Sequence, residues 1–515
     1  MRTVGDWVRL NFRRNPGKDA FVADDGRVTF GEAAEHAWGL GRGLRDLGGV
    51  PGGAVGELAG NSLFNAEVFL GVALSGGVYA AYNWRWAVEE LAAGIRETRA
   101  SVILVEERFE ENLSAALSLV AADQTFAGPL PRVVRQGEVE SLRVGSGVLD
   151  DVVTPADPLC LIYTGGSTGT PKAVVLSHGA ATANAINEMV SCNLGTAPDD
   201  RGLVLTPLFH SAALLCWLTT HFVAGSTSVI AAKFDEETLV RWAESERVTN
   251  MFLIPNMMRR MMDAGVFAAP GFQRHFRAMH TGAGLLPMPD QERFFDVLPQ
   301  ADLFFRYGLT EGGPPVTRPH TRGILDPRVD GSIGQPYFSV EAEVMSLDRE
   351  AIAEPGELGE ICVKGPALMS RYYGRPEATA EAMRGGWLHT GDLAVRDERG
   401  YFFFRDRLKE MIKTGGENVY SNEVEQVLHL HAAVLEAAVV GVPDLAWDEE
   451  VRAVVVLRDG MHAGVDELKQ HVREHLAGYK VPKTIVFIRP DEMPRSAAGK
   501  LEKIRLKQNL GWLPE

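Results

Sequence analysis

A glycine-rich segment near residue 165 carries the residue types that bind phosphate groups. It runs from Leu161 to His178 and reads LIYTGGSTGTPKAVVLSH. Its glycines can turn backbone N–H groups toward one point, its hydroxyls add donors, and its lysine adds a positive charge. These residues are Thr164, Gly165, Gly166, Ser167, Thr168, Gly169, Thr170 and Lys172. The segment therefore predicts a cradle for a polyphosphate.

Other interpretations of this segment compete with the cradle. A Walker A loop is excluded, because Pro171 precedes the lysine and Ala173 follows it. A serine hydrolase with Ser167 as nucleophile fits the letters GGSTG, but its nucleophile elbow requires a helix directly after the serine. Val174 and Val175 predict a strand there instead. A surface loop rich in serine and glycine is the plainest alternative.

The segments that must position this loop alternate between helix-like and strand-like patterns. Amphipathic stretches such as GEAAEHAWGLGRGLRDLG alternate with apolar runs such as SVILV over the first 120 residues, and a second series continues from Leu159 past Leu303. Such alternation is typical of βα units on parallel sheets. We therefore predict an α/β fold, with a large N-terminal domain of several subdomains and βα-layered sheets.

After Arg405 the pattern changes to that of a small α+β domain. The helix patterns SNEVEQVLHLHA and VDELKQHVREHLA flank the apolar strands VLEAAVVGV and VRAVVVL, and the strand TIVFI follows. We predict an N-terminal domain over residues 1–405, a connection over 406–409 and a C-terminal domain over 410–515.

Composition excludes several classes of protein. The 515 residues carry a formal net charge of −16, which opposes binding to nucleic acid, and the four cysteines form no CxxC pair. The N-terminus lacks the apolar stretch of a signal peptide. Gly202–Ala232 has no charged side chain, but Pro207 and His221 interrupt it and favour a buried core over a membrane span. We expect a cytoplasmic protein without an integral membrane segment; the sequence leaves its oligomeric state open.

Further motifs follow the glycine-rich segment in order. They are TGAG at 281–284, YGLTE at 307–311, GWLHTGD at 386–392, RDRLKE at 405–410, IKTGGENV at 412–419 and PRSAAGK at 494–500. Together with YTGGSTGTPKAVVLSH they resemble the adenylate-forming superfamily of acyl-CoA and aryl-CoA synthetases, carrier-protein adenylation domains and beetle luciferases. The resemblance covers almost the whole chain. It implies ATP, Mg²⁺ and CoA as ligands and a mobile C-terminal domain.

The resemblance implies roles for charged and aromatic residues in adenylation. Thr310 would contact phosphate, Glu311 would help to hold Mg²⁺, and Tyr307 would pack on adenine. Asp392 and Arg407 would bind the ribose hydroxyls. The remaining predicted nucleotide contacts are Gly282, Ala283, Gly284 and Gly308. Without the family, isolated acids and the RDRLKE cluster are more often simply solvated.

Three lysines have implied roles that change between two half-reactions. Lys500 would lie over the substrate carboxylate and the α-phosphate during adenylation, and Lys409 would be the hinge of a later rotation. The loop from Lys413 to Asn418 would then enter the site, where Gly415 and Gly416 would leave room for a pantetheine arm. The candidate catalytic residues are Lys500, Glu311, Thr310, Lys413 and Asn418.

Positions for CoA and for the acid are implied more loosely. Trp447 and Tyr479 match CoA contacts in relatives, although such aromatics are often core or edge packing. Nearby cations could meet CoA phosphates or be merely solvated; they are Lys480, Lys483, Lys503, Arg505 and Lys507. The implied acid pocket contains His210, Ser211, Ala212, Asn256 and Met257 beside Gly282. These residue types also fill ordinary cores.

Several positions depart from the family pattern. Gly165 replaces a usual serine, Ala173 replaces a glycine, Gly284 stands in an altered TGAGL segment, and Asp448 follows Trp447 where glycine is usual. No charged catalytic group is lost. We predict an ATP-dependent carboxylic acid:CoA ligase that forms an acyl-adenylate and then a thioester. The alternatives are an enzyme that passes the activated acid to a carrier protein, an amine or another nucleophile, and, more distantly, the Ser167 hydrolase.

Overall fold

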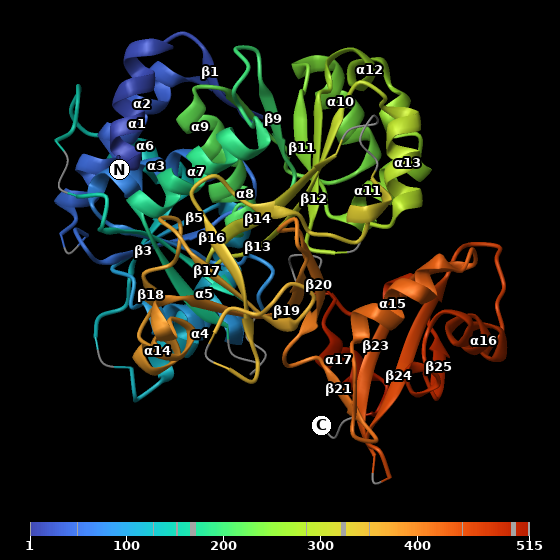
Figure 1. Ribbon diagram of the computed structural model, residues 1–515. Helices are drawn as coiled ribbons and strands as arrows, with labels where there is room; N and C mark the ends of the chain where they lie inside the picture. Colours follow the sequence, from blue (N-terminus) through green and yellow to red (C-terminus); the bar gives the residue numbers. More distant parts are fainter. Residues whose placement is uncertain are drawn as a thin grey trace. The chain divides into compact units, whose positions relative to one another are not determined.

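The computed structural model describes residues 2–48, 50–126, 128–150, 153–164, 171–284, 286–320, 326–349, 351–444, 446–495 and 501–512. The chain divides into two compact units (Figure 1). The first contains Met1–Asp326, Pro336–Glu341 and Val363–Leu388, and the second contains Pro327–Gln335, Ala342–Cys362 and His389–Glu515. The mixed α/β class predicted from the sequence is confirmed.

A seven-stranded sheet forms one layer of the first unit. Its strand order is β18-β8-β7-β4-β3-β5-β6. The strands are β3 (Ala54–Leu58), β4 (Val78–Ala81), β5 (Val102–Val105), β6 (Arg132–Arg135), β7 (Pro158–Thr164), β8 (Lys172–Ser177) and β18 (Arg371–Tyr372). The central strands β3, β4, β5 and β7 are parallel, and β3 is buried along its whole length, as a strand covered on both faces must be.

A nine-stranded sheet forms a second layer, in the order β15-β14-β13-β12-β11-β9-β10-β1-β2. The strands are β1 (Asp19–Ala23), β2 (Gly26–Thr29), β9 (Arg201–Val204), β10 (Thr227–Ile230), β11 (Asn250–Phe252), β12 (Ala278–Gly282), β13 (Asp302–Leu309), β14 (Gly313–His320) and β15 (Gln335–Pro336). From β1 through β13 the neighbours are parallel. The amino ends of these strands therefore share one edge and the carboxyl ends share the other.

Helices with clear local signals flank these sheets. Capping boxes at Thr3 and Thr29 begin α1 and α2, and α3 is buried on all sides between Ser62 and the left-handed Gly76, whose φ is 82°. The helices are α1 (Val4–Arg14), α2 (Phe30–Asp46), α3 (Leu63–Ser75), α4 (Val88–Thr98), α5 (Glu110–Ala122), α6 (Val139–Leu142), α7 (His178–Cys192), α8 (Ser211–Ala213), α9 (Thr220–Ala224), α10 (Glu236–Glu246), α11 (Pro255–Asp263), α12 (Pro270–His275), α13 (Met288–Val297) and α14 (Pro376–Ala382).

The charge-free run Gly202–Ala232 lies in the core of the first unit, as predicted. It forms most of β9, then α8, a π-helical turn at Leu214–Thr219, α9 and β10. Trp217, Phe222 and Val229 are buried. Among the described residues, no helix has the length and apolar character needed to cross a bilayer.

The second unit contains a four-stranded and a five-stranded sheet. The first has the order β16-β17-β19-β20, and the second has the order β22-β21-β24-β23 with β25 beside β24. The strands are β16 (Glu341–Ser346), β17 (Leu358–Lys364), β19 (Leu388–Arg396), β20 (Phe402–Arg407), β21 (Ile412–Thr414), β22 (Glu417–Val419), β23 (Val434–Asp444), β24 (Asp448–Leu457) and β25 (Thr484–Phe487), and the helices are α15 (Ser421–Leu430), α16 (Val465–His475) and α17 (Lys503–Asn509). Leu468 and Val472 of α16 are buried in the core beneath the five-stranded sheet.

The chain passes for the last time from the first compact unit to the second at His389, which is earlier than the predicted domain boundary at residue 405. The reason is that β16, β17, β19 and β20 form a sheet of their own, and most of it groups with the C-terminal residues. A hinge at 406–409 stays a prediction.

Candidate active site

The glycine-rich segment connects two antiparallel strands. Thr164 ends β7, Lys172 begins β8, and the two residues are register partners. The Thr164 hydroxyl donates to the Lys172 carbonyl over 3.4 Å. The predicted contacts from Gly165 to Thr170, Ser167 included, lie outside the described residues. The chain thus continues from Lys172 as a strand, whereas a nucleophile elbow leads into a helix.

Thr310 and Glu311 lie where β13 turns into β14, at the carboxyl edge of the nine-stranded sheet. The hydroxyls of Thr310 and Ser211 are 3.0 Å apart, so this edge joins a predicted phosphate contact to a predicted pocket residue. The Glu311 carbonyl accepts the Met369 N–H at 2.7 Å. These bonds hold the turn that presents both side chains.

Glu311 has a partner that the sequence did not reveal. The Tyr372 hydroxyl donates to Glu311 Oε1 at 2.9 Å, and Lys172 Nζ lies 4.8 Å from the centroid of the Tyr372 ring. Burial and the neighbouring carboxylate raise the pKa of Tyr372, so the hydroxyl stays a donor. The short strand β18 makes this possible by pairing with β8. Lys172, Tyr372 and Glu311 therefore form one connected group.

The TGAG segment at the end of β12 is shaped by its backbone. A Cβ atom on Gly282 would collide with the carbonyl of Arg306 on the neighbouring strand β13, so only glycine fits. Ala283 has a φ of 61°, which is unusual for a residue with a side chain. Ala283 and Gly284 are exposed. Gly308 approaches Pro314 so closely that a Cβ atom there would lie 2.5 Å from its Cα.

The predicted acid-pocket residues come from two helices. Ser211 and Ala212 open α8 directly after His210, whose ring lies 4.4 Å from that of Phe209. Asn256 and Met257 are in the first turn of α11. The Asn256 Oδ1 atom is buried and has no hydrogen-bond partner among the described residues. A buried acceptor left unpaired is costly, and a ligand donor would remove that cost.

In the second unit, strand pairing brings Asp392 and Arg407 together. They are register partners on β19 and β20, and Arg407 Nε lies 3.5 Å from Asp392 Oδ1. Asp392 is buried, whereas Arg407 is exposed. The two predicted ribose contacts are therefore neighbours.

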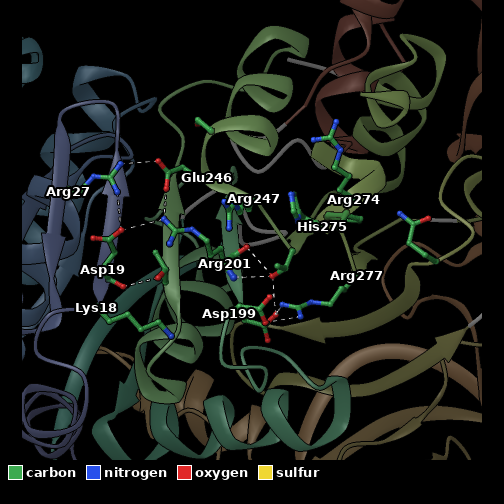
Figure 2. Close-up of a pocket in the computed structure, with 16 residues that line it drawn as sticks. Lys18, Asp19, Arg27, Asp199, Arg201, Glu246, Arg247, Arg274, His275 and Arg277 are labelled. Carbon is green, nitrogen blue, oxygen red and sulfur yellow. Dashed lines mark hydrogen bonds and ion pairs between the residues drawn. The ribbon is translucent and has the colours of Figure 1, made fainter. Parts of the chain in front are cut away.

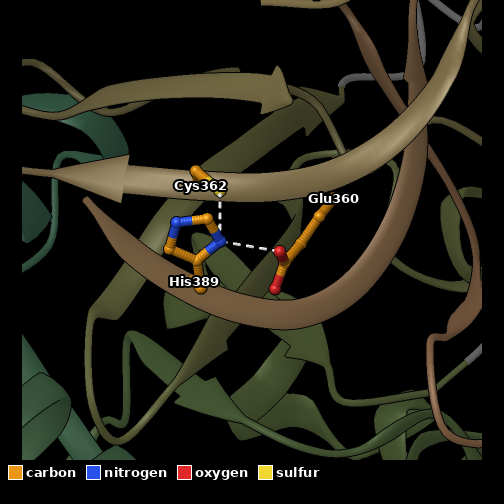
Figure 3. A group of neighbouring side chains, drawn as sticks. All are labelled: Glu360, Cys362 and His389. Carbon is orange, nitrogen blue, oxygen red and sulfur yellow. Dashed lines mark hydrogen bonds and ion pairs between the residues drawn. The ribbon is translucent and has the colours of Figure 1, made fainter. Parts of the chain in front are cut away.

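Glu360, Cys362 and His389 lie together near Asp392 in sequence and strand pairing, and Glu360 and Cys362 are buried (Figure 3). Glu360 accepts from the Gly391 N–H at 2.9 Å, and its other oxygen lies 2.7 Å from His389 Nδ1, which lies 3.3 Å from Cys362 Sγ. Carboxylate, imidazole and thiol are also metal ligands, and this is the one such group of three found among the described residues. The hydrogen bonds to Gly391 and His389 fit a role in holding the turn.

The loop expected to serve the second half-reaction is a hairpin of β21 and β22. Lys413, Gly416 and Asn418 are exposed, and Gly415 and Gly416 have φ values of 59° and 84°. The Gly415 N–H donates to the Trp447 carbonyl at 2.9 Å. This bond ties the hairpin to the turn that carries the predicted CoA contact.

Trp447 and Tyr479 are not core residues, because 43% and 42% of their surfaces are exposed. Lys483 Nζ lies 3.4 Å from the centroid of the Trp447 ring, and Lys480 Nζ lies 5.8 Å from that of Tyr479. Their exposure argues against the packing alternative, and the contact with CoA stays a prediction.

The sequence left Lys503 as either a contact for CoA phosphates or a solvated cation, and the structure places it in a cluster of acids instead. Its Nζ lies 2.8 Å from Glu425 and 3.3 Å from Glu410, and it donates to the Ser421 hydroxyl, which bonds to Asp406 at 3.1 Å. Burial opposes the charge of Lys503, but the carboxylates outweigh it and raise the pKa of the ammonium. The cluster ties the segment around the predicted hinge residue Lys409 to α15 and α17. Lys500 itself lies outside the described residues.

Two family models match the chain. The model for the AMP-binding enzyme matches residues 8–373, and the model for the AMP-binding enzyme C-terminal domain matches residues 423–500. The chain is 35% identical to a feruloyl-CoA synthase of Amycolatopsis sp, over 99% of both chains. It is 30% identical to ScoC, a fatty acid–[acyl-carrier-protein] ligase of Streptomyces coeruleorubidus, over 98% of this chain and 96% of that one.

The fold is similar to that of the amide bond synthetase McbA from Marinactinospora thermotolerans. The TM-score is 0.86 with 26% sequence identity, over 98% of this chain and 99% of that chain. Fold, motif order and full-length similarity therefore agree, and the chain belongs to the AMP-binding enzyme family, whose adenylate-forming members its motifs resemble.

Proposed function

We propose that the protein is an ATP-dependent carboxylic acid:CoA ligase that releases AMP and pyrophosphate. The observation that carries this proposal is the 35% identity to a feruloyl-CoA synthase over 99% of both chains. Similarity over the full length of both predicted domains supports the two-step reaction, because each domain is expected to contribute to both steps.

In the first step, a carboxylate oxygen attacks the α-phosphorus of ATP, and the bond to the pyrophosphate oxygen breaks. Attack by one anion on another requires fixed positive groups and donors. We assign phosphate binding to Lys172, Thr310 and the segment from Thr164 to Thr170, and ribose binding to Asp392 and Arg407. Lys500 would neutralise the charge that develops between the two reactants.

The Glu311 carboxylate fits Mg²⁺, because hard oxygen ligands suit this ion and Tyr372 holds one carboxylate oxygen in place. When bound, Mg²⁺ would offset phosphate charge. Glu311 would be the carboxylate that holds the ion.

In the second step, the thiol proton of CoA passes to solvent and the sulfur attacks the acyl carbonyl carbon. The bond from that carbon to the phosphate oxygen then breaks, and AMP leaves with the bonding electrons. We assign the hinge to Lys409 and the pantetheine passage to the hairpin from Lys413 to Asn418. The exposed aromatics Trp447 and Tyr479 would contact the nucleotide end of CoA. We place the reaction in the cytoplasm, which the four unpaired cysteines support.

The feruloyl-CoA synthase similarity favours an aromatic acid as substrate. A second function has its own support, because ScoC and McbA are named for transfer to a carrier protein and for amide bond formation. Both alternatives keep the adenylation step and differ in the acceptor.

Pyrophosphate release from MgATP tests the proposal across short, medium, long and aromatic acids, each with and without CoA. We expect multiple turnovers with aromatic acids only when CoA is present, and an acyl-CoA product. Acid-dependent pyrophosphate release at the same rate with and without CoA would instead support a carrier protein or an amine as acceptor. Absence of acid-dependent release would reject adenylation.

A further inference from the structure

A hollow lies at the edge of the nine-stranded sheet that is opposite to Thr310 and Glu311. It has a volume of about 880 Å³. Residues at the amino ends of successive strands line it: Asp19 of β1, Arg201 of β9 and Thr227 of β10 begin their strands, while Thr249 and Arg277 directly precede β11 and β12. These strands are parallel, so the hollow at their amino ends is separated from Thr310 and Glu311, at the carboxyl end of β13, by the length of the strands.

The lining is positively charged although the chain has a net charge of −16. Six Lys and Arg side chains and four carboxylates line the hollow, together with His275. Figure 2 shows the cations and acids arranged around this opening. The basic residues are Lys18, Arg27, Arg201, Arg247, Arg274 and Arg277, and the acidic residues are Asp19, Asp199, Asp200 and Glu246.

The four acids are already engaged by three of the arginines. Arg27 lies 3.0 Å from both Asp19 and Glu246, and Arg201 also pairs with Glu246. Arg277 binds Asp199 at 2.9 Å and Asp200 at 2.8 Å. None of these carboxylates forms an ion pair with Lys18, Arg247 or Arg274.

Two arginines are left over. Arg247 follows α10 with a φ of 52°, and Arg274 lies in the last turn of α12; both are exposed and neither forms an ion pair within the described ranges. Lys18 donates to the carbonyls of Pro198 at 3.0 Å and Gly225 at 2.7 Å, and the carboxylates of Asp199 and Asp200 partly offset its charge without forming an ion pair with it. Six cations against four carboxylates leave two positive charges in excess, and Arg247 and Arg274 are the cations of the lining that no acid among the described residues offsets.

We propose that this hollow binds a small anion that carries several phosphate groups. Arginine forks match phosphate oxygens, and two cations without acidic partners suit more than one phosphate. The volume lies in the range of ligand sites and exceeds the needs of a single phosphate. Phe276, the one aromatic ring of the lining besides the imidazole of His275, is buried, so no exposed phenyl or indole face offers a platform for a nucleobase. A polyphosphate therefore fits better than a nucleotide.

Calorimetric titration with inorganic tripolyphosphate, without Mg²⁺, tests the site. The titrations use the Lys172→Ala protein, so that the cation of the predicted active-site loop does not contribute. When Arg247→Asn and Arg274→Gln are introduced into this protein, its affinity for tripolyphosphate should fall at least ten-fold. In the Lys172→Ala protein, orthophosphate should bind at least ten-fold more weakly than tripolyphosphate. Asn is chosen at 247 because it tolerates a positive φ.

The control is Arg99→Asn with Arg132→Gln in the same background. Arg99 ends α4 with a φ of 48° and is exposed, as is Arg132, so the control matches the charge change and the backbone strain. If tripolyphosphate binding weakens equally in the test and control proteins, the loss reflects only the change in net charge, and the proposal is overturned. Unchanged binding in the test protein, or ATP binding tighter than tripolyphosphate at this site, would also overturn it. The result does not depend on the proposed ligase activity, because no turnover is measured.

Discussion

At the scale of single residues, the predicted adenylation residues of the first unit are held by neighbours as well as by their own strands. Glu311 receives the Tyr372 hydroxyl at 2.9 Å, and Thr310 lies 3.0 Å from the Ser211 hydroxyl. A carboxylate that must hold a metal ion gains from a donor that restricts its rotation. We therefore predict that Tyr372 positions Glu311 and that the effect is measurable.

Tyr372→Phe should lower the rate of acyl-adenylate formation about 10- to 100-fold, since a hydrogen bond to a charged group contributes about 1.5–3 kcal/mol. The loss should be accompanied by a higher Mg²⁺ requirement in a pyrophosphate-release assay. Tyr373→Phe is the matched control, because its hydroxyl makes only a 3.5 Å contact with the Thr98 carbonyl. An unchanged Mg²⁺ dependence in the Tyr372 variant would contradict a role in holding Glu311.

Lys500→Ala should slow acyl-adenylate formation 100-fold or more, on the scale of one strong electrostatic contact in a transition state. Conversion of a supplied acyl-adenylate with CoA to the thioester should change little. Lys507→Ala serves as the control for acyl-adenylate formation, because the Lys507 ammonium donates to the Gly441 carbonyl at 3.2 Å and its one predicted role, at the CoA phosphates, belongs to the second step. Pyrophosphate release at the normal rate would remove Lys500 from the mechanism.

At the scale of elements, the hairpin of β21 and β22 is predicted to act only in the second half-reaction. Gly416→Leu should therefore block thioester formation and spare adenylation, because its side chain would occupy the passage for pantetheine. Gly460→Leu controls for backbone strain, since Gly416 and Gly460 have φ values of 84° and 74° and both lie in open space. The two half-reactions are measured separately, with pyrophosphate release and with CoA consumption from acyl-adenylate. If Gly416→Leu lowers the rates of adenylation and of thioester formation equally, the hairpin does not act only in the second half-reaction.

Local sequence patterns predicted helices and strands correctly. The contacts between side chains that are distant in the sequence depend on strand pairing and packing, which local patterns do not show. The strand after the glycine-rich segment followed from Val174 and Val175, and the charge-free run Gly202–Ala232 was correctly assigned to the core. Tyr372 was missed because β18 meets β8 only after nearly two hundred intervening residues. Neither alternative for Lys503 included its ion pairs, for a similar reason: its partners Glu410 and Glu425 lie far away in the sequence. The roles of the site residues remain predictions.

At the scale of the whole molecule, buried histidines link the stability of the first unit to pH. His280 lies in the core between Phe304, at 4.7 Å, and Trp217, at 5.0 Å, and neither ring nitrogen has a hydrogen-bond partner within the described part of the chain. Burial lowers the pKa of His280 to about 3 and that of His221 to about 4. Both imidazoles are therefore neutral in the folded chain near neutral pH.

Acid should destabilise this unit as the pH falls below the ordinary histidine pKa of about 6.5, because the unfolded chain then binds protons that the folded chain does not. Each such histidine contributes about 1.4 kcal/mol per pH unit until its folded pKa is reached. His280→Phe should keep the stacking on Phe304 and reduce the loss of stability between pH 6.5 and 5 by about 2 kcal/mol. Denaturant unfolding followed by tryptophan fluorescence measures this difference, with the exposed His462→Gln as control. A variant with the same pH slope as the parent would mean that His280 is already protonated in the folded protein, or that this part of the molecule opens before it titrates; either result would contradict its assignment as a buried neutral group.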